Sequence, residues 1–190
     1  HPWDPPNIIR GQGNYVGIAG GYYDGLEASS DDVVYSSSFQ GWNSSNGVLF
    51  PNSEVGFGEI TDGSSNVLLI GEQSDFIYNA SGDKVDMRSA GKYGSFMGAN
   101  NSSIPTASSS WATQNWQRAY NVVTVRYDFN TVQAPGMGFD LGPNNPLTSA
   151  HPGSGGTVRC DGSTHSLNQS ISVETLVWLA IKNDGEVVHE

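Results

Sequence analysis

Basic residues are scarce in this chain. It contains eight Lys and Arg against 19 Asp and Glu, which gives a formal net charge of −11. Binding to nucleic acid requires a basic surface that neutralises phosphates, and adsorption to anionic lipid requires one too. The composition therefore predicts no nucleic acid partner and disfavours direct adsorption to anionic membranes.

Cysteine is almost absent. Cys160 is the single cysteine of the sequence, so no disulfide can form within the chain. A lone thiol is either a nucleophile or a small buried apolar side chain. Cys160 lies in a strand-like stretch beside a turn, which favours the second interpretation.

Long apolar runs are absent as well. No run of 18 apolar residues and no signal peptide is present, and the chain begins at His1 rather than at Met. We therefore expect any targeting or anchoring segment to lie upstream. Charged residues make up only 14% of the chain, so Ser, Asn, Thr and Gln must supply the polar surface. Such a surface is typical of a secreted protein.

Apolar residues and glycine are present in ordinary amounts. The hydrophobic fraction is 36%, and 24 glycines accompany it, which is enough for a real core. A length of 190 residues suits one domain. We expect residues 1–190 to form a single extracellular globular domain.

Several short segments carry strand patterns. Residues 14–19 and 48–50 read as short strands, and the apolar run at 67–70 reads as a strand buried on both faces. The segment 122–129 is rich in β-branched and aromatic residues, which favours a further strand. Residues 22–47 are rich in Tyr, Asp, Ser and Gly, and they predict a long surface loop.

The C-terminal part has the clearest pattern. Residues 156–160 and 163–167 flank Asp161-Gly162, which predicts a β-hairpin with a type I′ turn. Ser172 then precedes apolar residues at helical spacing, which predicts a short helix over 173–182. The expected fold class is α+β and β-dominated: an antiparallel sheet with long loops and a short C-terminal helix.

The same part of the chain carries a recognisable motif. His151, nine further residues and Asp161-Gly162 lie within SAHPGSGGTVRCDGSTHSLNQSISVETLVWLAIKNDGEVV. This segment resembles the His-x9-Asp-Gly signature of a large planctomycete family of unknown function, whose members carry a prepilin-type N-terminus. The upstream segments NGVLFPNSEV and ITDGSSNVLLIGE resemble the family's other recurring blocks. Residues 73–148 are unmatched and are expected to be a variable insertion, whereas 149–190 form the motif hairpin and helix.

The resemblance implies a role in assembly. Family membership implies a pseudopilin-like globular head, related to type II secretion pseudopilins and type IV pilins, that lacks its N-terminal helix here. The implied partners are other pilin-like subunits or the secretion machinery, and the missing helix would provide the only contact with the membrane. The implied location is extracellular or periplasmic, with the full-length precursor anchored in the membrane. The chain departs from the family pattern at Arg159, Cys160 and His165.

A hydrolase is the enzymatic alternative. His151, Asp161 and many serines supply the residue types of a catalytic triad, but no Gly-x-Ser-x-Gly elbow precedes a helix. The structural alternative is that the His151 ring caps backbone groups near Asn168 and that Asp161 bonds its own turn. A metal at these two residues is a third possibility. The spacing favours the structural roles, so we expect no enzyme activity.

Calcium is the metal that the composition favours, because Ca²⁺ takes hard oxygen ligands. Asp62, Asn66 and Glu72 offer such ligands around a turn. A second acidic set lies in one loop: Asp24, Glu27, Asp31 and Asp32. Neither set has EF-hand spacing, and an acidic surface without a specific ion explains both equally well. Paired spacings typical of zinc are absent.

Tryptophans suggest a second class of function. Trp42, Trp111 and Trp116 fall in expected loops, where exposed rings stack on sugars or on partner proteins. Burial in the core is the alternative for each of them. A surface-displayed module that binds carbohydrate or another substrate, with polysaccharide as its partner, is therefore the alternative function.

Overall fold

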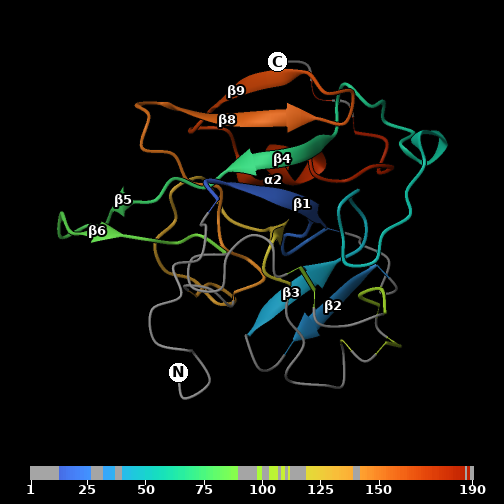
Figure 1. Cartoon of the computed structure of the whole chain (residues 1–190), viewed down its shortest axis with the longest axis horizontal. Helices are drawn as coiled ribbons and strands as arrows, with labels where there is room; N and C mark the ends of the chain where they lie inside the picture. Colours follow the sequence, from blue (N-terminus) through green and yellow to red (C-terminus); the bar gives the residue numbers. More distant parts are fainter. Residues whose placement is uncertain are drawn as a thin grey trace.

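A five-stranded sheet organises the computed structural model (Figure 1). The structure describes residues 13–26, 32–36, 40–89, 98–99, 103–106, 108–109, 111, 119–138, 142–186 and 188. The strands are β1 (Tyr15–Gly21), β4 (Leu68–Glu72), β7 (Val122–Val125), β8 (Ser154–Arg159) and β9 (Thr164–Asn168). Their order is β7-β1-β4-β8-β9, and β1 with β7 is the only parallel pair in this sheet.

Smaller elements surround the sheet. Two hairpins are formed by β2 (Val33–Ser36) with β3 (Gly41–Ser44) and by β5 (Ile77–Tyr78) with β6 (Lys84–Val85). A 3₁₀ turn, η1, spans Phe57–Glu59, and the helix α2 spans Val173–Trp178. The predicted class is confirmed: a β-dominated fold with mainly antiparallel pairing, long loops and a short C-terminal helix.

The core lies between α2 and one face of the sheet. Leu176 and Val177 of α2 are fully buried against Ile18 of β1 and Leu68 of β4. Gly21 permits this close packing, because a Cβ there would lie 2.8 Å from Cγ1 of Val177. Burial of such side chains contributes about 1.5–3 kcal/mol each.

The helix begins where the sequence predicts. The Ser172 hydroxyl caps it by accepting the N–H of Thr175 at 3.2 Å. It ends at Trp178, four residues before the predicted end. The N–H groups of Ala180 and Ile181 bond to carbonyls three residues earlier, at Val177 and Trp178, so the chain tightens into turns there.

One loop prediction and two strand predictions need correction. Residues 22–47 are not all loop, because β2 and β3 form a hairpin within them. Residues 48–50 are no strand, although Leu49 N–H still bonds to the Ile18 carbonyl. The strand expected over 122–129 ends at Val125, after which Phe129 turns into the core. The predictions near β1 and β4 are confirmed, but Leu69 and Ile70 of β4 are only partly buried.

Asparagine side chains hold the loops on the sheet. Asn144 is 1% exposed; its amide accepts the Trp42 N–H at 2.7 Å and donates to the Trp42 carbonyl at 3.0 Å. Asn46 pairs in the same way with Gly21, at 3.1 and 3.0 Å. Each amide therefore accepts one backbone hydrogen bond and donates another, as a neighbouring strand would. It satisfies buried backbone groups at places where no strand is present.

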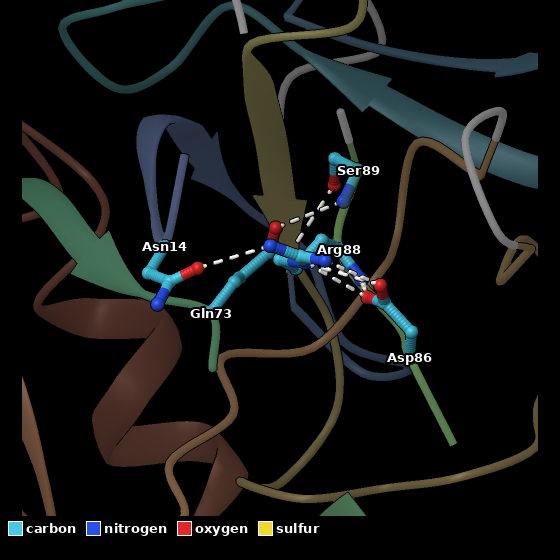
Figure 2. A network of polar contacts seen from close by, with 5 residues as sticks. All are labelled: Asn14, Gln73, Asp86, Arg88 and Ser89. Atoms are coloured by element: carbon cyan, nitrogen blue, oxygen red, sulfur yellow. Dashed lines mark hydrogen bonds and ion pairs between the residues drawn. The ribbon is translucent and has the colours of Figure 1, made fainter. Parts of the chain in front are cut away.

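A second polar network ties residues 86–89 to the sheet (Figure 2). The Arg88 guanidinium forms an ion pair with Asp86 at 2.6 Å and a hydrogen bond to the Asn14 side chain at 3.0 Å. The side chain of Gln73 accepts the N–H of Ser89 at 2.9 Å. Residues 86–89 and β7 both lie within 73–148, so parts of that span belong to the main framework.

Candidate functional site

The His-x9-Asp-Gly motif forms the β8–β9 hairpin at one end of the sheet (Figure 1). His151 precedes β8 and Asp161 follows it. A six-residue strand spans roughly 17 Å at the usual rise of about 3.3 Å per residue. The two motif residues therefore lie at opposite ends of β8, too far apart to act on one substrate atom.

Asp161 stabilises the turn of the hairpin. Its Oδ1 accepts the N–H of Ser163 at 2.9 Å and the Ser163 hydroxyl at 2.6 Å. These two hydrogen bonds hold the pKa of Asp161 below its usual value. The turn is not type I′, because Gly162 has a φ of 86° while Asp161 keeps a negative φ. The Gly162 N–H bonds to the Arg159 carbonyl, which fits a type I turn followed by a glycine bulge.

Ser163 also contacts His165, which brings Asp, Ser and His side chains together. The Ser163 hydroxyl lies 3.0 Å from Nε2 of His165 and 2.6 Å from Asp161. In a catalytic triad the imidazole lies between the other two groups and takes the hydroxyl proton. Here the hydroxyl lies in the middle and donates to the carboxylate. This order stabilises a turn and does not activate a nucleophile.

Gln169 holds the other end of the hairpin, although no sequence pattern marks it. Its side-chain nitrogen lies 3.2, 2.9 and 3.0 Å from the carbonyl oxygens of Ser149, His151 and Ser154. The His151 ring was expected to cap this region, but it is exposed and forms no hydrogen bond with the described residues. The amide nitrogen carries two N–H groups, so one of them is shared between two of the three carbonyls, whereas a neutral imidazole ring has a single N–H donor.

Cys160 is partly buried beside the turn. It packs against a small apolar cluster formed by Val48, Ile60 and Val67. Burial, and after it the charge of Asp161, raises the pKa of the Cys160 thiol to about 11. The thiolate is the nucleophilic form, so this environment disfavours nucleophilic chemistry at neutral pH.

The residues predicted to bind calcium are not all neighbours. The Asn66 side chain donates to the Asp62 carbonyl at 2.7 Å, so these two lie together. Glu72 lies at the far end of β4, roughly 13 Å along the strand from Leu68. Its carboxylate accepts the Ser74 hydroxyl and the Gly156 N–H, both at 2.8 Å. The extended strand therefore separates Glu72 from the other two.

The acidic loop is engaged in part with the protein itself. Asp24 forms an ion pair with Arg126 at 3.0 Å, whereas Glu27 and Asp31 lie outside the described residues. Within the described part of the chain, no group of three or more His, Cys, Asp or Glu side chains is arranged to hold a metal ion.

The three loop tryptophans differ in environment. Trp111 is 1% exposed and its indole N–H donates to the Ser103 carbonyl at 2.8 Å, so it has no free ring face. Trp42 is partly buried, with its ring 4.4 Å from Tyr22 and 5.2 Å from Tyr35. Trp116 lies outside the described residues.

No strand or loop among the described residues pairs with the outer edge of β9. The Arg159 N–H bonds to the Ser163 carbonyl and the Gln169 N–H to the Gly153 carbonyl, which fixes the alternation of the ladder. The backbone N–H and C=O groups of His165 and Leu167 therefore point toward β8, and those of Thr164 and Ser166 point away from it. Beside this edge, a groove of about 420 Å³ lies between Leu167, Ile171 and Val188. Strand order is not encoded locally, so this edge could not be predicted from the sequence.

A second groove of about 420 Å³ lies on the sheet face opposite to α2. Its walls include Tyr15, Phe50 and Asn121. The sequence held one signal for this groove: the outward position of Tyr15 in the alternating pattern of β1.

The comparisons with known proteins give one match. A family model described as "Protein of unknown function (DUF1559)" matches residues 19–174. No curated protein and no solved structure matches the chain. Among the residues that the structure describes, no helix has the length and apolar character needed to cross a membrane.

Proposed function

This chain belongs to the DUF1559 family of proteins of unknown function, and on that premise we propose that it is the outer domain of a non-enzymatic, pilin-like assembly subunit. The full-length protein is anchored in a membrane and displays this domain in the periplasm or outside the cell. The proposal draws on the His-x9-Asp-Gly motif, which resembles that of prepilin-type proteins. Its partners are other subunits of the same kind or the secretion machinery.

One observation carries the proposal: the motif region supports a hairpin whose outer strand pairs with no other described residue. Asp161 holds the turn end of the hairpin and Gln169 holds its other end. Between them, β9 offers the backbone N–H and C=O groups of Thr164 and Ser166. An open edge of this kind is a template for strand pairing with another chain.

The composition of β9 supports pairing. Natural edge strands are usually protected by Lys, Pro, a bulge or an inward charge. Thr164–Asn168 contains no Lys, Pro, Asp or Glu, and its register with β8 is unbroken. In a chain with a net charge of −11, a strand without carboxylates is a place where two copies meet with little repulsion.

The geometry around the motif favours the assembly role over hydrolysis. His151 and Asp161 lie at opposite ends of β8, and the Ser163 hydroxyl donates to a carboxylate instead of to an imidazole. Both arrangements serve the hairpin, and neither prepares a nucleophile.

Cross-linking in the full-length protein tests the proposal. A photo-crosslinker is attached to Ser166→Cys in a Cys160→Ala background, and the protein is activated in its native cells. We expect adducts whose mass corresponds to two or more subunits. The matched control is Ser81→Cys, an exposed serine in the β5–β6 turn, which should give few such adducts. Equal yields at both positions, or adducts at Ser166→Cys without a second subunit, would contradict the proposal.

A further inference from the structure

The floor of the groove opposite to α2 is a glycine in the middle of the sheet. Gly17 of β1 lies between Ile70 of β4 and Val122 of β7. A Cβ at Gly17 would lie 2.9 Å from Cγ1 of Val122 and 3.2 Å from Cδ1 of Leu49. The missing side chain therefore deepens the hollow, whose volume of about 420 Å³ falls in the range of ligand sites.

A rigid turn forms one wall. The Ser53 N–H bonds to the Phe50 carbonyl at 3.0 Å, with Pro51 between them and Asn52 at a φ of 62°. Pro followed by Asn with a positive φ is typical of a type II turn. The Asn52 side chain donates to the Ser103 carbonyl at 3.0 Å, which fixes the turn from outside. The backbone of this turn is thus held in place before any ligand binds, and the Lys182 ammonium lies 5.6 Å from the centroid of the Phe50 ring.

Tyr15 provides an aromatic surface at the other wall. Its side chain is 58% exposed, which is unusual for a large ring on a sheet. The ring extends past β4 to Gly156 of β8, where a Cβ would lie 3.6 Å from the tyrosine hydroxyl oxygen. This is an ordinary van der Waals distance, so Tyr15 rests against the sheet while more than half of its surface is open to solvent.

The described lining of the groove is uncharged and offers hydrogen bonds. It contains no Asp, Glu, Lys or Arg, although the chain carries 19 acidic residues. Ser53 and Asn121 contribute a hydroxyl and an amide, neither of which is bonded to another described residue through its side chain. A ligand for this groove has apolar faces and neutral polar edges. Pyranose rings have this character, because they stack on aromatic rings and exchange hydrogen bonds with amides.

A peptide strand fits less well. β1 is paired on both sides, with β4 and with β7, so the floor of the groove has no open strand edge for an added strand. Acidic sugars also fit less well, because no Lys or Arg is among the described residues that line the groove. We propose that this groove binds a neutral oligosaccharide, stacked between Tyr15 and Phe50 and hydrogen-bonded by Asn121.

A panel of neutral and acidic oligosaccharides on a glycan array, followed by calorimetric titration of the best binder, tests the proposal. We expect saturable binding of a neutral glycan that Tyr15→Ala weakens about tenfold or more, the usual size of one lost stacking contact. Tyr78→Ala is the matched control, because Tyr78 is 61% exposed on a different hairpin, and it should bind like the unchanged protein.

Asn121→Ala provides a second variant that spares the aromatic surface, and it should also weaken binding. Thermal melting verifies that each variant is folded. Binding that is equally strong in Tyr15→Ala and Tyr78→Ala would overturn the proposal, as would a panel in which no neutral glycan binds. The cross-linking result at Ser166→Cys is independent of either outcome, because β9 and this groove share no residue.

Discussion

The carboxylate of Asp62 binds the backbone of Asp184. Oδ2 of Asp62 accepts the Asp184 N–H at 2.9 Å, and Oδ1 accepts the Gly185 N–H at 3.0 Å. This contact ties the segment after α2 to the turn before β4. It also places the Asp184 carboxyl group near that of Asp62 in a partly buried position. Burial, and next the neighbouring Asp62, raises the pKa of Asp184 to about 6.

Replacing Asp184 by Asn should stabilise the protein at neutral pH. The folded-state pKa of about 6 lies above the ordinary value of 3.8, so the folded protein binds the proton more tightly. Its free energy of unfolding therefore falls as the pH rises from about 4 to 6, and the full penalty is present above pH 6. Because Asp184 is partly exposed, we expect a gain of only about 1 kcal/mol at pH 7 and no gain at pH 3.

Urea denaturation at several pH values measures this effect. Asp75→Asn is the matched control, because Asp75 is exposed and forms no hydrogen bond with the described residues. A gain for Asp184→Asn that is independent of pH, or a gain of equal size for Asp75→Asn, would show that the carboxyl pair is not its source.

The Cys160 thiol should react slowly with Ellman's reagent. With a pKa of about 11, about one thiol in a thousand is ionised at pH 8. We expect a rate about a hundred times lower than that of an exposed thiol of ordinary pKa, for which Ser81→Cys in a Cys160→Ala background provides the comparison. Comparable rates for the two thiols would show that Cys160 is accessible and activated.

Loss of the Gln169 amide should destabilise the motif hairpin. Gln169→Ala removes the donor for three backbone carbonyls, so we expect the free energy of unfolding to fall by about 1–3 kcal/mol. Gln133→Ala, at an exposed glutamine, should change it by less than about 0.5 kcal/mol, and His151→Ala should also have little effect. If His151→Ala proves more damaging than Gln169→Ala in chemical denaturation, the assignment of the cap to Gln169 is wrong.

Local signals were enough to predict part of this fold. The Asp161-Gly162 turn and the Ser172 cap depend on residues within a few positions of each other, and both elements are where the sequence predicts them. Asn144 illustrates what sequence patterns miss. It bonds to Trp42, 102 residues away, and its polarity alone suggests only a loop.

The candidate sites were predictable to a smaller extent. The importance of the motif region was visible in the sequence, but Gln169 and the open edge of β9 depend on how distant strands align. The predicted calcium site was wrong for the opposite reason. Asn66 and Glu72 are close in sequence, but an extended strand separates them in space. Spacing along a chain determines proximity in space only when the intervening structure is known.

Backbone hydrogen exchange at β9 is the most direct test of the assembly proposal. In the isolated domain the N–H groups of Thr164 and Ser166 should exchange rapidly, whereas that of Leu167, paired with Gly155, should be protected. In the assembled full-length protein we expect exchange at Thr164 and Ser166 to become at least about tenfold slower. Equally rapid exchange at these two residues in both states would contradict the account.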